Sequence, residues 1–263
     1  MIDYEPRRWR SHFFDVRGTM LREILYRVMF CAVAAVVAVV LRRLGHTPHL
    51  PDEPHLFVGP ALALLLVFRT NTANDRYWEG RKLWGSIVNA ARNLDRKARS
   101  LLVEHRPLAE AVIDFCWATR ARLGGTIPTA ATALAAAARM TDLVTTAQRG
   151  GAITDVQQAM LDRDVSMLVD CLGGCERIAL TPLPFAYVVH LRRALLLYCG
   201  TLPFVLVETF GVYTIPATLF VSYILLGIEE IGMEIENPFG NAPNHLQIDR
   251  ICTSLEATLR REA

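Results

Sequence analysis

A dense group of charged and polar side chains follows directly after an apolar run without a charge, residues 56–68. Its members are Arg69, Asn71, Asp75, Arg76, Glu79 and Arg81. Charges of both signs recur at short helical separations, so pairs such as Arg76 with Glu79 can form across one turn of a helix. This spacing supports ion pairing on a solvated helix face, with direct contact to a passing ion as the alternative. Asn71 and Asp75 alternatively cap a helical turn just beyond the apolar run.

The sequence carries no recognisable pattern of catalysis. It contains no Walker loop, nucleophile elbow, paired metal-binding histidines or glycine-rich dinucleotide fingerprint. Its seven histidines are dispersed, and its six cysteines lack the spacing of a zinc site or a disulfide framework. The formal net charge of +2 says little about partners, and no strongly basic or acidic face suggests nucleic acid, so none is expected. We therefore expect a protein that is not an enzyme and that holds no metal or cofactor.

The composition points to a membrane protein instead. Hydrophobic residues make up 52% of the chain, the mean hydropathy is +0.26, and the charges gather between long apolar segments. A basic, aromatic lead-in over residues 1–22 suits a membrane interface. The first spanning helix is predicted over residues 24–41, with the long side chain of Arg27 reaching the headgroups. Glycine and prolines then turn the chain, which re-enters the membrane with a helix over 54–70.

Two further spans are predicted at residues 184–207 and 212–229, because Pro182 and Pro184 interrupt any helix that precedes them. Positive charge is dense from residue 69 onward, and the positive-inside bias places that part and the N-terminus in the cytoplasm. An even number of spans returns the C-terminus to the same side. The sequence thus predicts an all-α protein with four spans and a helical cytosolic domain.

The part between the second and third spans reads as a set of helices. One long helix leaves the membrane and continues from residue 74 to about 103, and others follow over 108–123, over an alanine-rich stretch from 128 to 140, and over 154–172. The expected organisation is an interfacial segment 1–22, spans one and two in 23–73, a cytosolic domain 74–182, spans three and four in 183–232 and a cytosolic segment 233–263.

Three stretches of the chain together resemble one family. They are FRTNTANDRYWEGRKLWG at 68–85, TPLPFAY at 181–187 and ENPFGNAPNHLQID at 236–249, and they include the motif residues Pro182, Pro184, Asn237, Pro238 and Gly240. In this order between apolar segments they resemble the bestrophin family of ion channels, in its bacterial branch. The resemblance implies a homopentamer in the cell inner membrane, four helices per subunit, and one central pore with a narrow neck and a large cytosolic chamber. It also implies self-association, contact with the lipid bilayer, and passage of small monovalent ions, chloride or other anions first.

The neck and a second constriction can be placed by counting. Steps of four residues back from Arg69 give one predicted stripe, Leu65, Ala61, Phe57 and Glu53. The family neck falls on Glu53, Phe57 and Ala61 at this spacing, and the cytosolic aperture falls on Ile178 or Thr181. Asn237 to Gly240 read as a helix stop and a tight turn, after which the acidic calcium clasp of eukaryotic bestrophins is replaced by Asn, Ala, Pro, Asn and His, so calcium activation by that clasp is not expected.

Two alternatives to an anion channel stay open. A ring of Glu53 carboxylates at the outer mouth would favour cations, which makes a cation (sodium)-selective channel the first alternative. A membrane scaffold or transporter subunit with a regulatory cytosolic domain is the second. A transporter more often shows internal repeats or polar interruptions at membrane depth. None of these is visible in the sequence.

Overall fold

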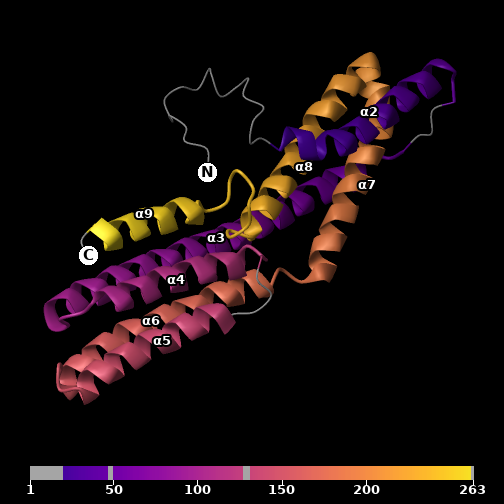
Figure 1. Cartoon of the computed structure of the whole chain (residues 1–263). Helices are drawn as coiled ribbons and strands as arrows, with labels where there is room; N and C mark the ends of the chain where they lie inside the picture. The colour runs from indigo at the N-terminus through magenta and orange to yellow at the C-terminus, as the bar shows by residue number, and fades with distance from the viewer. Residues whose placement is uncertain (1–19, 47–49, 127–130, 262–263) are drawn as a thin grey trace. The chain divides into compact units, whose positions relative to one another are not determined.

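The computed structural model describes residues 20–46, 50–126 and 131–261, and the regular elements in these ranges are helices (Figure 1). They are α2 (Leu21–Arg43), α3 (Glu53–Leu101), α4 (Arg106–Leu123), α5 (Ala131–Arg149), α6 (Asp155–Leu180), α7 (Phe185–Phe210), the 3-10 turn η1 (Gly211–Tyr213), α8 (Thr214–Glu236) and α9 (Ile248–Arg261). The all-α prediction is confirmed for this part of the chain. Most of the predicted lead-in 1–22, and the predicted start of the alanine-rich helix at residue 128, lie outside the described residues.

The contacts divide the chain into two compact units. The spanning unit contains residues 20–75 and 183–236, and the bundle unit contains residues 76–182 and 237–261. Helix α3 contributes its first part to the spanning unit and its second part to the bundle unit. The segment after α8, for which the sequence predicted only a turn and a polar end, packs with the bundle unit through α9.

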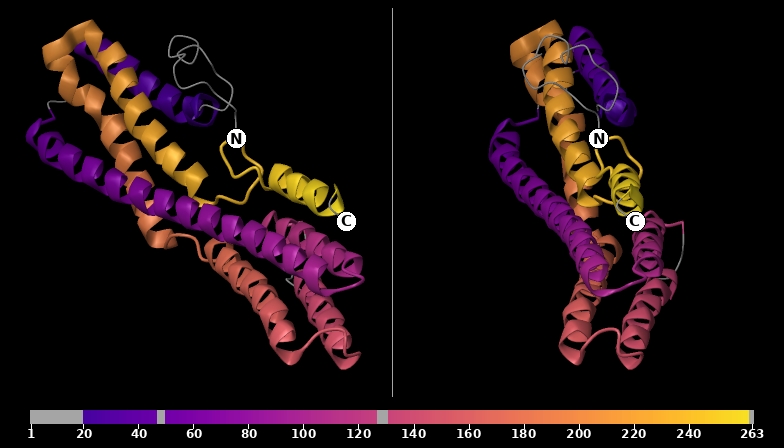
Figure 2. Two further views of the ribbon diagram at one scale, coloured as in Figure 1. Left: turned by 90° about the vertical axis from the view of Figure 1, so that its left-hand side faces the viewer. Right: turned by 60° about the vertical axis from the view of Figure 1, so that its left-hand side comes forward.

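Three stretches of the described chain are long and apolar enough to cross a membrane: Leu21–Arg43, Glu53–Leu101 and Phe185–Glu236. The third contains both α7 and α8, which double back on each other at η1 (Figures 1 and 2). Gly211 makes this reversal, since its φ of 56° lies in the left-handed region that side chains disfavour. Helix α2 packs against both α7 and α8. The predicted spans 24–41, 184–207 and 212–229 fall on these three helices to within two residues.

Small side chains let the helices of the spanning unit approach closely. Cys31, Ala35 and Ala38 of α2 are buried, and so are Thr218 and Ser222 of α8. Without a hydrophobic drive between helices in lipid, such small residues at the contact are what permit tight packing. The first part of α3 joins the same core through Leu62 and Leu66, which cluster with leucines of α7 and α8.

Helix α3 runs without interruption over 49 residues. This confirms the prediction of one helix that continues from the apolar run into the charged region. Asn71 and Asp75 lie in its interior, so the predicted capping role was wrong: no helix end exists there for them to cap. Pro60 also lies inside the helix.

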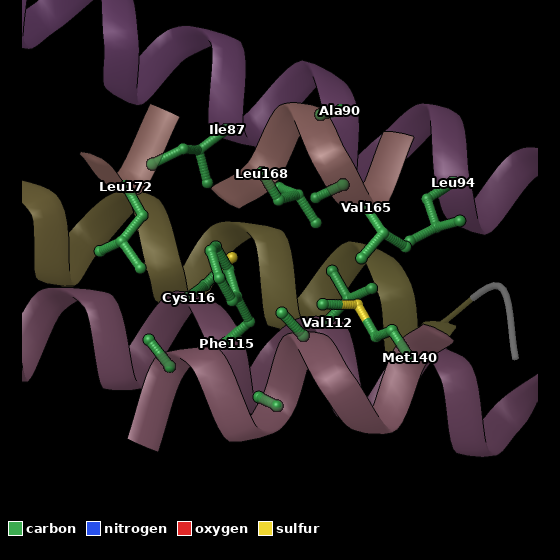
Figure 3. Packing of buried hydrophobic residues seen from close by; sticks show 14 of the residues in the cluster. Ile87, Ala90, Leu94, Val112, Phe115, Cys116, Met140, Val165, Leu168 and Leu172 are labelled. Carbon is green, nitrogen blue, oxygen red and sulfur yellow. The ribbon is translucent and has the colours of Figure 1, made fainter. Parts of the chain in front are cut away.

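The bundle unit packs α4, α5, α6, α9 and the second part of α3 around one core (Figure 3). Ile87 and Leu94 of α3 point toward Phe115 and Val112 of α4, with Leu168 of α6 between the helices (Figure 3). Each helix supplies apolar residues at helical spacing, which is what drives such a bundle together.

Two predicted helix ends in this unit were too early. The alanine-rich helix continues past Met140 to Arg149, and the helix predicted to end at residue 172 continues to Leu180. Helix α6 continues through Gly174, against which Leu83 of α3 lies directly. A Cβ added at Gly174 would lie 2.9 Å from the Leu83 Cδ1 atom. The glycine therefore serves close packing here, not helix termination.

Candidate functional site

Helix α3 has one buried and one exposed face in the spanning unit. Its buried face is formed by Leu62, Leu66, Arg69 and Ala73. The opposite face forms what we call the exposed row: Glu53, Phe57, Ala61, Leu64 and Phe68. The side chain of Phe57 is 75% exposed, and those of Leu64 and Phe68 are also more than half exposed. A row of large apolar side chains is thus left uncovered by the described chain.

Leu65 does not belong to this row. It is half-buried and packs against the leucine cluster of the spanning unit, and its carbonyl oxygen accepts a hydrogen bond of 3.1 Å from the hydroxyl of Tyr187. The predicted stripe assumed that every fourth residue stays on one face. Since a helix has 3.6 residues per turn, each step of four drifts by about 40°, so Leu65 lies roughly 120° around the helix from Glu53. Leu64 takes the place predicted for Leu65.

Arg69 is buried on the inner face of α3, with only 1% of its surface exposed. Its Nη2 atom lies 3.7 Å from Oε1 of Glu229 and 3.4 Å from Oε2 of Glu236, both on α8. Gly232, between these glutamates, lies beside the arginine stem: a Cβ there would be in ordinary contact with the Arg69 Cγ atom, at 3.7 Å. The predicted solvated position of Arg69 was therefore wrong: its charge is neutralised inside the helix bundle.

Two further arginines converge on the same part of α8. Arg27 of α2 donates from Nη1 to Glu230 at 2.7 Å and lies 3.4 Å from Glu229, while Arg192 of α7 donates from Nε to Glu229 at 2.8 Å. The sequence did not predict that Arg27 pairs with the buried carboxylates of Glu229 and Glu230, although its side chain is still 21% exposed. Glu229 thus pairs with arginines from three different helices.

We call these six residues the arginine–glutamate cluster: Arg27, Arg69, Arg192, Glu229, Glu230 and Glu236. Three positive and three negative side chains balance one another within it. Charged groups inside a spanning bundle are expensive, and they persist when they pair with one another. The second oxygen of Glu236 accepts from the backbone N–H of Leu183 at 2.8 Å, which ties the start of the α7 segment to the same cluster. Sequence reasoning missed the cluster, although adjacent glutamates at the edge of a predicted span were the available signal.

Two further charged residues of the α3 motif, Arg76 and Glu79, have partners at the end of α6 in the bundle unit. Arg76 donates from Nη1 to the carbonyl oxygen of Thr181 at 2.7 Å and from Nη2 to that of Ile178 at 2.6 Å. Glu79 pairs with Arg177 of α6. The predicted Arg76–Glu79 pair is therefore wrong: Arg76 binds carbonyl oxygens at the C-terminal end of α6, which attract a guanidinium, and Glu79 pairs with a guanidinium of the same helix.

Arg81 is exposed and lies over the ring of Trp78, with 5.0 Å between the guanidinium carbon and the ring centroid. Asn71 and Asp75 are exposed as well, on the continuation of the exposed row. These residues of the motif thus face outward from the described chain.

The turn after α8 shows what Asn237, Pro238 and Phe239 of its motif contact. α8 ends at Glu236, as predicted, and Asn237 accepts a hydrogen bond of 3.2 Å from the backbone N–H of Phe239. Phe239 is fully buried and lies against Gly80 of α3, where a Cβ would come within 2.9 Å of the phenyl ring and 2.8 Å of Pro238. The turn therefore docks an aromatic side chain onto a glycine of α3, and the two motifs form one contact.

The two aperture candidates lie in different surroundings. Ile178 is 3% exposed and belongs to the core of the bundle unit, so its side chain is not available to line a passage in this structure. Thr181 is exposed at the end of α6. Pro182 and Pro184 lie between α6 and α7, and they separate the two helices as predicted.

The segment aligned with the calcium clasp is held by an arginine. Arg120 of α4 donates to Oδ1 of Asn241 at 2.7 Å and to the two carboxylate oxygens of Asp249 at 2.8 and 3.0 Å. In the part of the chain that the structure describes, no three His, Cys, Asp or Glu side chains gather in a geometry that could hold a metal ion. The positively charged group that binds this segment is the guanidinium of Arg120.

These features define an all-helical, multi-pass membrane protein whose spanning helices are locked by buried ion pairs. A family model described as "Bacterial/Fungal Bestrophin protein" matches residues 1–261, and the chain belongs to this family. Among its relatives, the "voltage-dependent anion channel-forming protein" of Nostoc sp. is 37% identical, over 96% of this chain and 91% of the relative. A protein of the same description from Escherichia coli is 29% identical, over 98% of this chain and 93% of the relative.

Solved structures agree with this assignment. The crystal structure of a bacterial bestrophin homolog from Klebsiella pneumoniae matches with a TM-score of 0.84 at 30% sequence identity, over 90% of this chain and 97% of that chain. The family resemblance of the three sequence motifs is thereby confirmed.

Proposed function

We propose that this chain forms an anion-conducting channel as a homopentamer, with α3 of each subunit lining one central pore. The exposed row of α3 supports this most directly. A spanning unit that buries Leu62, Leu66 and Arg69 while it leaves Phe57, Leu64 and Phe68 uncovered offers the second face of α3 to other copies and to a pore between them. The relatives named for anion-channel formation support the class of permeant ion.

The proposed subunit has four spans. α2 has 23 residues, α7 has 26 and α8 has 23. At a rise of about 1.5 Å per residue each is longer than the roughly 30 Å hydrocarbon core, so α7 and α8 can cross separately, with the first part of α3 as the fourth span. In the proposed orientation both termini and the bundle unit lie on the cytoplasmic side of a bacterial inner membrane, and the dense positive charge that follows residue 69 supports this.

In the proposed pore, the neck consists of the exposed row. Phe57, Ala61, Leu64 and Phe68 present apolar side chains at successive turns, and such a ring can gate a channel by excluding water. Thr181 is the aperture candidate that remains exposed, and we retain it in place of Ile178. The arginine–glutamate cluster supports the neck from behind, because it holds the buried face of α3 against α8.

A cation-selective channel is the second candidate, and one observation favours it. Glu53 begins α3 and is exposed at the end of the row, next to an exposed Asp52. Five symmetry-related copies would place a ring of carboxylates at the mouth, which raises the local concentration of cations. A scaffold or transporter subunit is the third candidate, and it predicts no conductance.

One set of recordings separates the three. The full chain is purified in detergent, its mass is measured, and it is reconstituted in planar bilayers with asymmetric sodium chloride. We expect a mass of five chains and a reversal potential near that of chloride. A stable monomer or dimer would contradict the pore between copies. A reversal potential near that of sodium would support the cation channel, and silent bilayers would support the scaffold.

A further inference from the structure

A second feature of the spanning unit is a cavity of about 420 Å³ between α2, α7 and α8. Its polar end is formed by Arg27, Arg192 and Glu229, and its apolar walls come from Phe30, Leu196 and Leu226 with Tyr26 and Leu195. The volume lies within the range of small-ligand sites, roughly 300–1,000 Å³. The exposed row is on α3, which does not line this cavity, so the cavity has no part in the proposed pore.

The polar end of the cavity offers hydrogen-bond donors more than acceptors. Both oxygens of Glu229 already face arginines: Oε1 lies 2.8 Å from Arg192 and 3.7 Å from Arg69, and Oε2 lies 3.4 Å from Arg27. Glu230, the other partner of Arg27, is 2% exposed and does not line the cavity. The two guanidiniums are the accessible groups, since the Arg192 side chain is 40% exposed and that of Arg27 is 21% exposed. An anionic group fits this end.

The cavity has a charged end and an apolar end, in the order in which a phospholipid at the membrane surface presents its headgroup and its acyl chains. Arg27 lies six residues into α2 and Arg192 seven residues into α7, about 10 Å from each helix start at 1.5 Å per residue. Beyond them, α2 carries no charge until Arg42, and α7 carries none from Ala194 until Glu208. The arginines therefore mark the polar boundary, and the walls formed by Phe30 and Leu196 continue into the apolar stretch. A headgroup phosphate at one end and an acyl chain at the other would match these surroundings.

We propose that this cavity binds one anionic phospholipid of the cytoplasmic leaflet, with its phosphate on the guanidiniums of Arg27 and Arg192 and an acyl chain along Phe30 and Leu196. The choice of leaflet rests on the proposed orientation of the chain. The binding itself does not depend on conduction, so a silent channel that still binds lipid would contradict the proposed function alone.

Native mass spectrometry of the full chain tests the proposal with two pairs of neighbouring variants. Delipidated protein is titrated with phosphatidylglycerol or with phosphatidylcholine of the same acyl chains. We expect at least about tenfold stronger retention of one phosphatidylglycerol per chain. Arg192→Gln should abolish this preference, whereas Arg193→Gln, which removes the same charge from the adjacent exposed position, should keep it. Leu196→Trp fills the apolar part and should weaken binding about tenfold, whereas Leu197→Trp, just outside the cavity, should not.

The same method, extended by one competitor and one deletion variant, gives the outcomes that would overturn the proposal. Equal losses in Arg192→Gln and Arg193→Gln would mean that lipid responds only to surface charge. Unchanged binding in Leu196→Trp would place the lipid elsewhere, and this pair decides the question if Arg192→Gln fails to assemble. Displacement by glycerol 3-phosphate, which lacks acyl chains, would identify a free phosphate site. Retention that appears only after deletion of residues 1–19 would mean that the chain's own N-terminal segment occupies the cavity.

Discussion

Glu229 connects three spanning helices to α8 through ion pairs. Its carboxylate pairs with arginines from α2, α3 and α7 while it is itself 1% exposed. Removing one partner of a buried ion pair leaves the others uncompensated, at a cost of about 3–5 kcal/mol. We expect Glu229→Gln to lower the free energy of unfolding by that amount, which thermal unfolding in detergent would show as a drop of several degrees in the midpoint.

The control for this variant is Glu208→Gln. Glu208 is about half exposed, and its nearest cation is Arg42 at 3.7 Å. An exposed pair of this kind contributes at most about 1 kcal/mol. Equal midpoints for the two variants would show that the cluster does not stabilise the bundle.

The buried cysteines of the bundle unit give a second prediction. Cys116, Cys175 and Cys252 are reduced and almost fully buried, and burial, which disfavours the thiolate, raises the pKa of Cys175 and Cys252 to about 12 from an ordinary 9.0. We expect N-ethylmaleimide at pH 8 to leave them unmodified in the native protein and to modify them after denaturation, as measured by intact mass. A cysteine introduced at the exposed position Asn93 should react at once.

The same thiols predict how the stability of the fold changes at alkaline pH. Between pH of about 9 and 12 the unfolded chain loses these protons while the native chain keeps them, so the native state binds more protons and stability falls as pH rises. Rapid labelling of Cys175 at pH 8 in the folded protein would contradict the burial on which both statements rest.

Individual side-chain partners were the part of the structure that the sequence predicted least well. The sequence did not predict that Arg27 and Arg69 pair with glutamates, because spacing along one helix says nothing about charges on another. Their partners Glu229 and Glu236 follow about 160 to 200 residues later in the chain. Only the tertiary packing of α2 and α3 against α8 brings these charges together, and a buried arginine cannot be distinguished from an exposed one by type alone.

Substitutions at two neighbouring leucines of α3 test whether the exposed row forms the neck of the pore. Leu64 lies on the row and Leu65 lies off it, half-buried against the leucine cluster. If the row forms an apolar neck that excludes water, Leu64→Ala should raise single-channel conductance or open probability. Leu65→Ala makes the same truncation about 100° around the helix and should leave conductance unchanged. Phe57→Ala should act in the same direction as Leu64→Ala.

The opposite pattern of currents would move the pore to the other face of α3. An effect of Leu65→Ala without one of Leu64→Ala would restore the stripe of every fourth residue that the sequence suggested. The assembly mass of each variant should be checked alongside, because Leu65 also packs inside the subunit.

Elements themselves were predictable where the apolar pattern was long. The uninterrupted helix α3 followed from periodicity that continues across residue 69, and the break between α6 and α7 followed from two prolines. Helix ends were less secure: the helix predicted to end at residue 172 continues to Leu180, with Gly174 inside it against Leu83. Helix α9 escaped notice because its apolar face is short: Ile248, Cys252, Leu255 and Leu259 are its buried residues among many charges.

For the whole molecule, ion selectivity depends on which residues the copies bring together at the mouth of the pore. Glu53 is exposed at the first position of α3. If five copies form a ring there, Glu53→Gln should shift the reversal potential in a sodium chloride gradient toward that of chloride. The shift should be larger at low ionic strength, because salt screens exposed charges over about 10 Å at 0.1 M.

Glu208→Gln serves as the comparison here too, since it removes a carboxylate near the end of α7 that pairs with Arg42 of α2 and is not on α3. A reversal potential that does not move for Glu53→Gln at low salt would remove Glu53 from the permeation path. The apolar segments and three motifs were enough to predict the class of membrane protein. Ion selectivity could not be predicted in the same way, because it depends on residues that different copies of the chain bring together.

The arginine–glutamate cluster also bears on how the protein is synthesised. Translation delivers Arg27, Arg69 and Arg192 before Glu229, so three cations enter the bilayer region ahead of the carboxylate that they share. An unpaired charge costs about 2.5–3.5 kcal/mol at a helix centre on insertion scales and less near the membrane surface, and these arginines lack their shared partner until α8 is made. The ion pairs of the cluster, and the packing that depends on them, can therefore form only after this helix has been synthesised.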